Sequence, residues 1–183
     1  MFRKFRFVVD AIFKLAMGYS LTQLIKSKDI LTPILNVVQR KAELFRELDE
    51  LVGRVDWLKH VVKEDLCTSF SERVDLPDSC MYVILTLPSR LRYADLQILL
   101  FHKDKEVLNY QYTIISEDLV EKYMSHIDID KLHRLLTKLS SNGIEFRDVF
   151  KQAVLRLIDR VNDCLNATQH LIKAVKLYIA LME

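Results

Sequence analysis

Apolar residues recur at intervals of three and four along most of the chain, which is the spacing of one face of an α-helix. This pattern predicts helices over residues 1–28, 32–68 and 144–183. The second and third of these helices carry rows that repeat every seven residues, and Lys41 alone interrupts the row of the second, so we expect them to pack on each other. The residues expected in helix-face packing or in an interface are Leu44, Leu48, Leu51, Val55, Leu58, Leu157, Val161, Leu171, Val175 and Tyr178.

The period changes to two between residues 80 and 116. Apolar and polar residues alternate over 107–115, and two shorter apolar runs precede this segment at 81–87 and 96–101. Alternation of this kind is typical of a half-buried strand, so the three runs predict a three-stranded antiparallel meander. Helical spacing returns afterwards and predicts short helices over 117–142.

Residues that break helices are scarce, because the chain has only three glycines and three prolines. A sandwich or barrel needs turn residues at short intervals, so this composition favours long helices. We therefore predict an α+β, predominantly helical fold, in which a bundle of long amphipathic helices has a small three-stranded antiparallel sheet inserted between them. The length of 183 residues suits a single domain spanning 1–183.

The same composition excludes several classes of function. Gly18, Gly53 and Gly143 stand too far apart for a G-x-G-x-x-G turn or a P-loop, so nucleotide binding by those routes is not expected. No stretch is long and apolar enough for a transmembrane helix. The apolar stretch near the start contains Asp10 and Lys14, which argues against a signal peptide, and we expect a cytoplasmic protein that is not secreted.

The three cysteines, Cys67, Cys80 and Cys164, are odd in number and form no C-x-x-C pair. A disulfide framework or a zinc knuckle normally shows an even number or a short spacing. The pattern therefore predicts free, partly buried thiols in a reducing compartment.

The sequence offers one metal-like cluster, formed by His126 and His133 with Asp128 and Asp130 between them. Seven residues separate the histidines, which is not the i, i+4 spacing that aims two ligands at one ion. We interpret Asp128 or Asp130 as a helix cap and expect no metal, no cofactor and no catalytic residues. The chain is therefore not expected to be an enzyme.

Basic residues gather at the N-terminus. Residues 1–30 hold six basic and two acidic side chains, a net charge of +4, whereas residues 31–75 hold seven and nine, a net charge of −2. The basic residues near the start alternate with phenylalanines, so this segment could dock on the bundle, contact the phosphates of a nucleic acid, or lie on a membrane surface. The candidate contact residues are Arg3, Lys4, Arg6 and Lys14.

Long seven-residue repeats without a catalytic motif favour a non-enzymatic structural or interaction protein. We expect it to assemble with itself, as a homo-oligomer, or with partner chains through its long amphipathic helices. The alternative hypothesis is a nucleic-acid-associated protein, packaging or coat-like, that contacts phosphates through its basic N-terminal segment. Peripheral contact with a membrane is a third interpretation of that segment.

Overall fold

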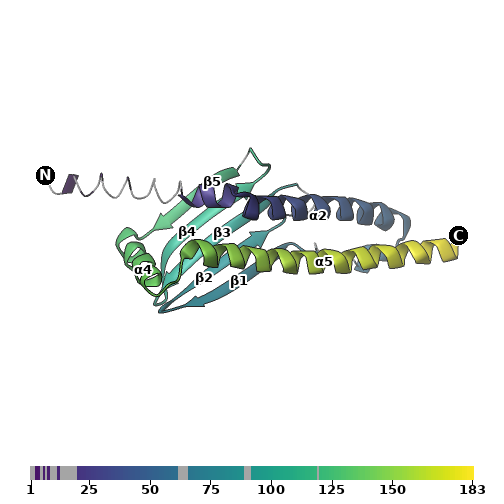
Figure 1. Cartoon of the computed structure of the whole chain (residues 1–183). Coiled ribbons are helices and arrows are strands. Elements are labelled where there is room, and N and C mark those ends of the chain that lie inside the picture. Colours follow the sequence, from purple (N-terminus) through teal and green to yellow (C-terminus); the bar gives the residue numbers. More distant parts are fainter. Residues whose placement is uncertain are drawn as a thin grey trace.

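Two long helices lie side by side over one face of an antiparallel sheet in the computed structural model (Figure 1). The structure describes residues 3, 4, 6, 8, 12, 20–61, 66–88, 92–118 and 120–183. Residues 20–26 are helical and precede the first labelled element. The elements then follow in the order α2 (Lys28–Arg54), α3 (Leu58–Val61), β1 (Ser69–Leu76), β2 (Ser79–Thr86), β3 (Ala94–His102), β4 (Lys105–Ile114), β5 (Val120–Ile127), α4 (Ile129–Ser141) and α5 (Phe146–Met182).

Helices α2 and α5 run in the same direction, and we call this pair the stem. Asp29 pairs with Lys151 near their starts at 2.8 Å, and Arg54 pairs with Glu183 near their ends at 2.7 Å. The hydrogen bond from Lys151, together with its positive charge, lowers the pKa of Asp29 below the usual value. The stem extends past the end of the sheet, so its last turns have no strand beneath them (Figure 1).

The described strands form one sheet of five in the order β1-β2-β3-β4-β5, with every neighbouring pair antiparallel. Tight turns connect β1 to β2 and β3 to β4. Asp78, Lys103 and Asp104 take positive φ values of 55°, 48° and 66° in these turns. This left-handed conformation is uncommon outside glycine, and short polar side chains such as aspartate tolerate it best.

The core lies between the sheet and the helices. In β2 the side chains of Met81, Val83 and Leu85 are fully buried, and the residues between them are partly exposed. Helix α5 packs on β1 and β2, α2 packs on β3, and α4 packs on β4. Because side chains alternate between the faces of a strand, these contacts place all three helices on the same face of the sheet. Each buried aliphatic side chain stabilises the fold by about 1.5–3 kcal/mol relative to an exposed one.

The predicted fold class, a bundle of helices with a small three-stranded sheet inserted between them, is wrong. In the described residues the sheet has five strands, and the helices form a layer on it. The strands β1 and β5 are the two that the sequence reading missed. Both are edge strands. In β1 only Phe70, Val74 and Leu76 pack against the core, and the exposed positions between them are polar or charged. Such a mixed pattern resembles a solvated segment. The residues of β5 fall within 117–142, where the spacing predicts short helices.

The predicted helix over 32–68 is also wrong in its bounds. Helix α2 begins at Lys28 after Ser27, before the predicted start at residue 32, and Pro33 lies inside it. It ends at Arg54, directly after Gly53, and Val55 is already extended. The apolar row continues through Val55 and the first residue of α3 because this connecting segment also packs on the core.

A disulfide joins Cys67 to Cys164, so the expectation of three free thiols is wrong. The Cα atoms are 5.9 Å apart, although 97 positions separate the two residues in the chain. Cys67 precedes β1, and Cys164 lies in the middle of α5. The bond therefore ties the chain entering the sheet to the stem, and Cys80 is the free cysteine.

Polar side chains are also buried in the core, among them Lys41 and Tyr112. Lys41, which interrupts the apolar row of α2, is 2% exposed, and its Nζ donates to the Leu87 carbonyl at 2.5 Å and lies 5.2 Å from the centre of the Phe45 ring. The Thr22 hydroxyl donates to the Tyr112 hydroxyl at 3.5 Å and links residues 20–26 to β4. Burial raises the pKa of Tyr112 to about 12, so this phenol stays neutral.

Candidate functional site

The basic N-terminal segment is described at a few positions only. Arg3, Lys4 and Arg6 are helical and exposed, and Lys14 lies outside the described residues. Arg6 donates to the Asp130 carboxylate at 2.8 Å, and no ion pair joins Arg3 or Lys4 to another described residue. The Arg6 and Asp130 side chains are 71% and 59% exposed, so their pair contributes little to stability.

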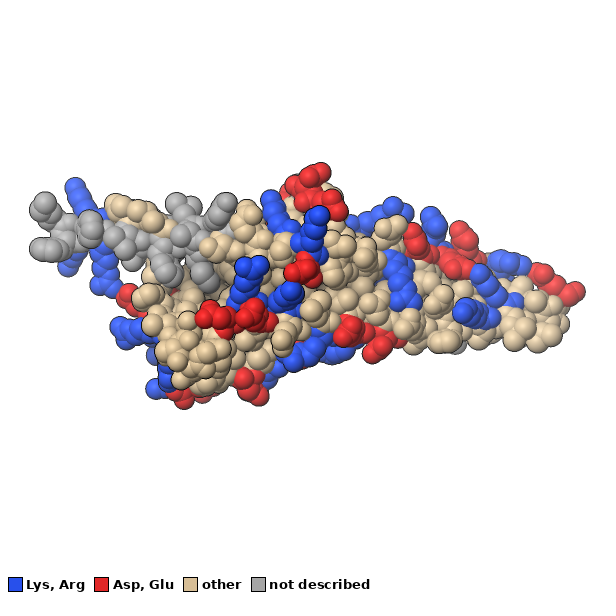
Figure 2. All heavy atoms as spheres, viewed as in Figure 1, with Lys and Arg blue, Asp and Glu red and all other residues tan. Residues whose placement is uncertain are grey.

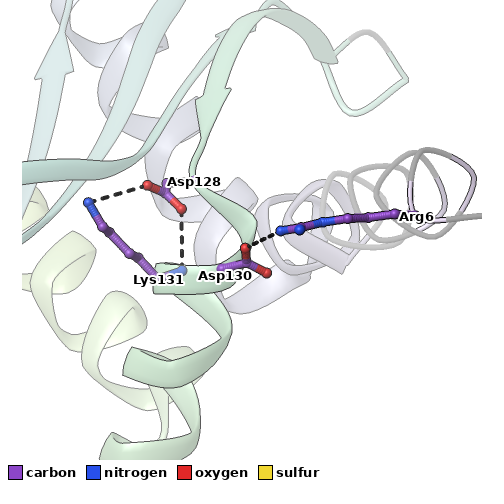
Figure 3. A network of polar contacts seen from close by, with 4 residues as sticks. All are labelled: Arg6, Asp128, Asp130 and Lys131. Atoms are coloured by element: carbon purple, nitrogen blue, oxygen red, sulfur yellow. Dashed lines mark hydrogen bonds and ion pairs between the residues drawn. The ribbon is translucent and has the colours of Figure 1, made fainter. Parts of the chain in front are cut away.

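The predicted cap at the start of α4 is present (Figure 3). The Asp128 carboxylate accepts a hydrogen bond from the Lys131 backbone N–H at 3.3 Å, and the Lys131 Nζ lies 3.6 Å from it. Asp130 points toward Arg6 instead. Among the residues that the structure describes, no three histidines, cysteines or acids come together in a way that could hold a metal ion.

The residues predicted for helix-face packing or an interface are mostly used inside the chain. Leu44 and Leu171 are half-buried against the core, and Tyr178 is 40% exposed. The seven other predicted residues are buried: Leu48, Leu51, Val55, Leu58, Leu157, Val161 and Val175. The rows therefore hold the stem together and fix it on the sheet, and Tyr178 is the member that remains available to a partner.

Apolar side chains are exposed where the stem has left the sheet. Their exposed fractions are 45% for Trp57, 62% for Leu177, 40% for Tyr178, 76% for Leu181 and 70% for Met182. We call these five residues the apolar tip. The Trp57 and Tyr178 rings meet edge to face with their centres 5.5 Å apart, which links the end of α2 to α5. Figure 2 shows uncharged surface among the charged side chains at this end of the molecule.

The rim of the apolar tip is polar. Arg54 pairs with Glu183, and Lys176 pairs with Glu47, so each pair connects α5 to α2. A protein–protein interface commonly combines an apolar centre rich in tryptophan, tyrosine and methionine with a polar rim. The two ion pairs are exposed and add little stability, but they join α5 to α2 at this end of the stem.

Sequence reasoning missed four members of the apolar tip, namely Trp57, Leu177, Leu181 and Met182. Met182 falls in a row of the last helix that is otherwise buried, whereas Leu177 and Leu181 belong to no buried row. A signal was present, because Leu177 and Leu181 stand four apart on the outward side of the helix. The sequence does not show that the sheet stops short of this part of the stem.

A groove of about 490 Å³ lies where residues 20–26, α4 and the start of α5 meet. Leu21, Leu24, Leu136 and Phe146 give it an apolar lining, and Arg147 is the one charged residue among the described residues that line it. Catalytic pockets normally bring several titratable groups together. The described lining of this groove contains one positively charged side chain and no cluster of titratable groups.

The chain matches no model of a known protein family, and no curated protein matches it in sequence. None of the helices in the described part of the chain is long and apolar enough to cross a membrane. Among the residues that the structure describes, the apolar tip gathers five of the ten exposed large apolar side chains.

Proposed function

We propose that this chain is a non-enzymatic interaction protein that assembles with itself or with partner chains through the end of its stem. The observation that carries the proposal is the exposure of five large apolar side chains in the apolar tip. A contiguous exposed apolar patch with a polar rim is a mark of an interaction site, because soluble proteins otherwise bury such groups. Tryptophan and tyrosine are also the residues that most often dominate binding energy.

The architecture supports this proposal by holding the apolar tip in place. The rows of α2 and α5 are buried against each other and the sheet, so the stem needs no partner to keep its shape. The disulfide between Cys67 and Cys164 fixes α5 to the start of the sheet. A surface on preformed helices loses less conformational entropy on binding than a flexible segment does, which favours affinity.

Photo-crosslinking tests whether the apolar tip enters an interface. A photoreactive phenylalanine analogue replaces Leu177 in the full chain, which is expressed in its own cells, and adducts are separated by mass after illumination. We expect a discrete adduct with another protein chain, because the Leu177 side chain is 62% exposed and carries no internal packing role.

The matched control places the same analogue at Gln152, an exposed position earlier in the same helix. Its adducts should be weak and diffuse. Equal labelling from both positions, or none from either, would count against an interface at the apolar tip.

The basic N-terminal segment supports a second proposal, a nucleic-acid-associated function. The specific observation is that Arg3 and Lys4 are exposed on a segment with a net charge of +4 over residues 1–30. Phosphates bound by basic side chains release counterions, which makes affinity depend steeply on salt. Arg6 contributes less in this interpretation, since Asp130 already pairs with it.

Salt titration tests this second proposal. Replacing Arg3 and Lys4 with alanine should flatten the dependence of log affinity on log salt by about 1.4 units on a single strand, because two phosphate contacts are lost. Binding of a labelled single-stranded oligonucleotide can be followed by fluorescence anisotropy. Replacing Lys103, in the turn between β3 and β4, and Lys105, at the start of β4, is the charge-matched control and should leave the slope unchanged. Affinity that does not vary with salt would reject nucleic-acid binding.

A further inference from the structure

The groove between residues 20–26, α4 and the start of α5 takes no part in either proposed function. It lies at the end of the molecule opposite the apolar tip (Figure 1). Its volume of about 490 Å³ falls within the range of about 300–1,000 Å³ that small-molecule sites occupy. The 37 residues of α5 span about 55 Å from one end to the other. A small molecule in the groove would therefore not touch the apolar tip.

The floor of the groove is apolar. Leu21 is 2% exposed and belongs to the core. Leu24, Leu136 and Phe146 are half-buried, and each of them lines the groove. The Phe146 ring stacks on the ring of the buried Phe150 with their centres 6.2 Å apart, which holds it in place. An alkyl chain that covers this apolar floor removes apolar surface from water on both partners, which favours binding.

The rim of the groove carries a positive charge on Arg147. This side chain is exposed, and no ion pair joins it to another residue that the structure describes. Asp29 pairs instead with Lys151 at 2.8 Å; the hydrogen bond and charge of Lys151 lower the pKa of Asp29, and the charge of Arg147 adds a smaller effect. Asp148 follows in the sequence, but adjacent helical residues do not face each other. The guanidinium of Arg147 is therefore available to form two parallel hydrogen bonds with a carboxylate.

We propose that the groove binds an alkyl carboxylate, as in a free fatty acid, with its carboxylate on Arg147 and its tail along the apolar floor. Charge complementarity selects this ligand, because the described lining holds one positive charge and no negative one. A ligand with several phosphates would keep charges without partners, and a cationic ligand would be repelled. Ser20 and Gln23 line the same groove and add hydrogen-bond donors for the carboxylate oxygens.

Isothermal titration calorimetry of the purified full chain with sodium octanoate, decanoate and dodecanoate, each below the concentration at which it forms micelles, tests the ligand class. We expect saturable binding of one molecule per chain. Each methylene buried on the apolar floor strengthens binding by up to about fourfold, so dodecanoate should bind at least about tenfold more tightly than octanoate. Binding that is absent, or that does not strengthen with chain length, overturns the proposal.

The charge is tested with Arg147→Gln, which should weaken the binding of dodecanoate about fivefold, as expected for an exposed ion pair. The matched control is Arg134→Gln, which removes the same charge from an exposed position of α4 outside the groove lining and should leave the affinity within about twofold. Equal affinities of the two variants would exclude a carboxylate bound at Arg147.

Fluorescence distinguishes the groove from the apolar tip, which also offers an apolar surface to an alkyl chain. Trp57 is the one tryptophan of the chain and belongs to the apolar tip, so its emission should stay unchanged when dodecanoate is added. Phe146→Trp in a Trp57→Phe background should shift its emission to shorter wavelength on the same addition, because the tail covers this position. A response from Trp57 with none from Phe146→Trp would place the alkyl chain at the apolar tip and overturn the proposal.

Discussion

Removal of the disulfide between Cys67 and Cys164 is expected to lower the free energy of unfolding by about 4 kcal/mol. The bond closes a loop with a sequence separation of 97, and loops of this size restrict the unfolded chain strongly. Urea unfolding of the double variant Cys67→Ser and Cys164→Ser, followed by circular dichroism, measures the loss against wild type.

The control for this measurement is Cys80→Ser, since Cys80 is the free cysteine and only half-buried. This single change should alter stability by less than about 0.5 kcal/mol. A reducing agent should destabilise wild type and leave the double variant unaffected. If wild type unfolds at the same urea concentration with and without reductant, the two thiols are free in solution, as the sequence pattern predicts.

The disulfide bears on whether the protein resides in an oxidising or a reducing compartment. Structural disulfides persist in oxidising surroundings and are rare where glutathione keeps thiols reduced. The odd number and wide spacing of the cysteines predict free thiols in a reducing compartment. Since the fold brings Cys67 and Cys164 to a Cα separation of 5.9 Å, the cysteine pattern no longer supports a reducing compartment.

The sequence predicted elements best where their pattern is long. The three-and-four spacing of α2 and α5 extends over many turns, and the interior strand β4 shows clear alternation in its sequence. Edge strands lack this advantage, because one side of the ladder is open. In β1 the serines and charged residues between its apolar positions hide the period of two. The count of strands, and with it the fold class, therefore could not be read from local patterns.

The candidate site was harder to predict than the elements, since a pattern identifies apolar residues without showing what covers them. Leu48 and Leu177 are both leucines in long amphipathic helices. Leu48 is fully buried, and Leu177 is 62% exposed. Glu47 pairs with Lys176, so the two leucines that follow these residues lie at the same level of the stem, and their difference arises from the side of the helix that each one occupies.

This difference leads to the second large prediction, that Leu48→Ala destabilises the fold by about 3 kcal/mol. Leu48 is 0% exposed and belongs to the buried core, so truncation removes buried methyl groups and leaves a cavity. Chemical unfolding in urea gives the change directly.

Leu177→Ala is the matched control, because it removes the same atoms from the same kind of helix. Its side chain is mostly in water, so the expected change in the isolated chain is below about 0.5 kcal/mol. The contrast separates the two roles of leucine in the stem: at position 48 it stabilises the fold, and at position 177 it is free to stabilise a complex. A large decrease in the free energy of unfolding from Leu177→Ala in dilute, monomeric protein would mean that the end of the stem is covered within the chain. The apolar tip would then not be an exposed interaction surface.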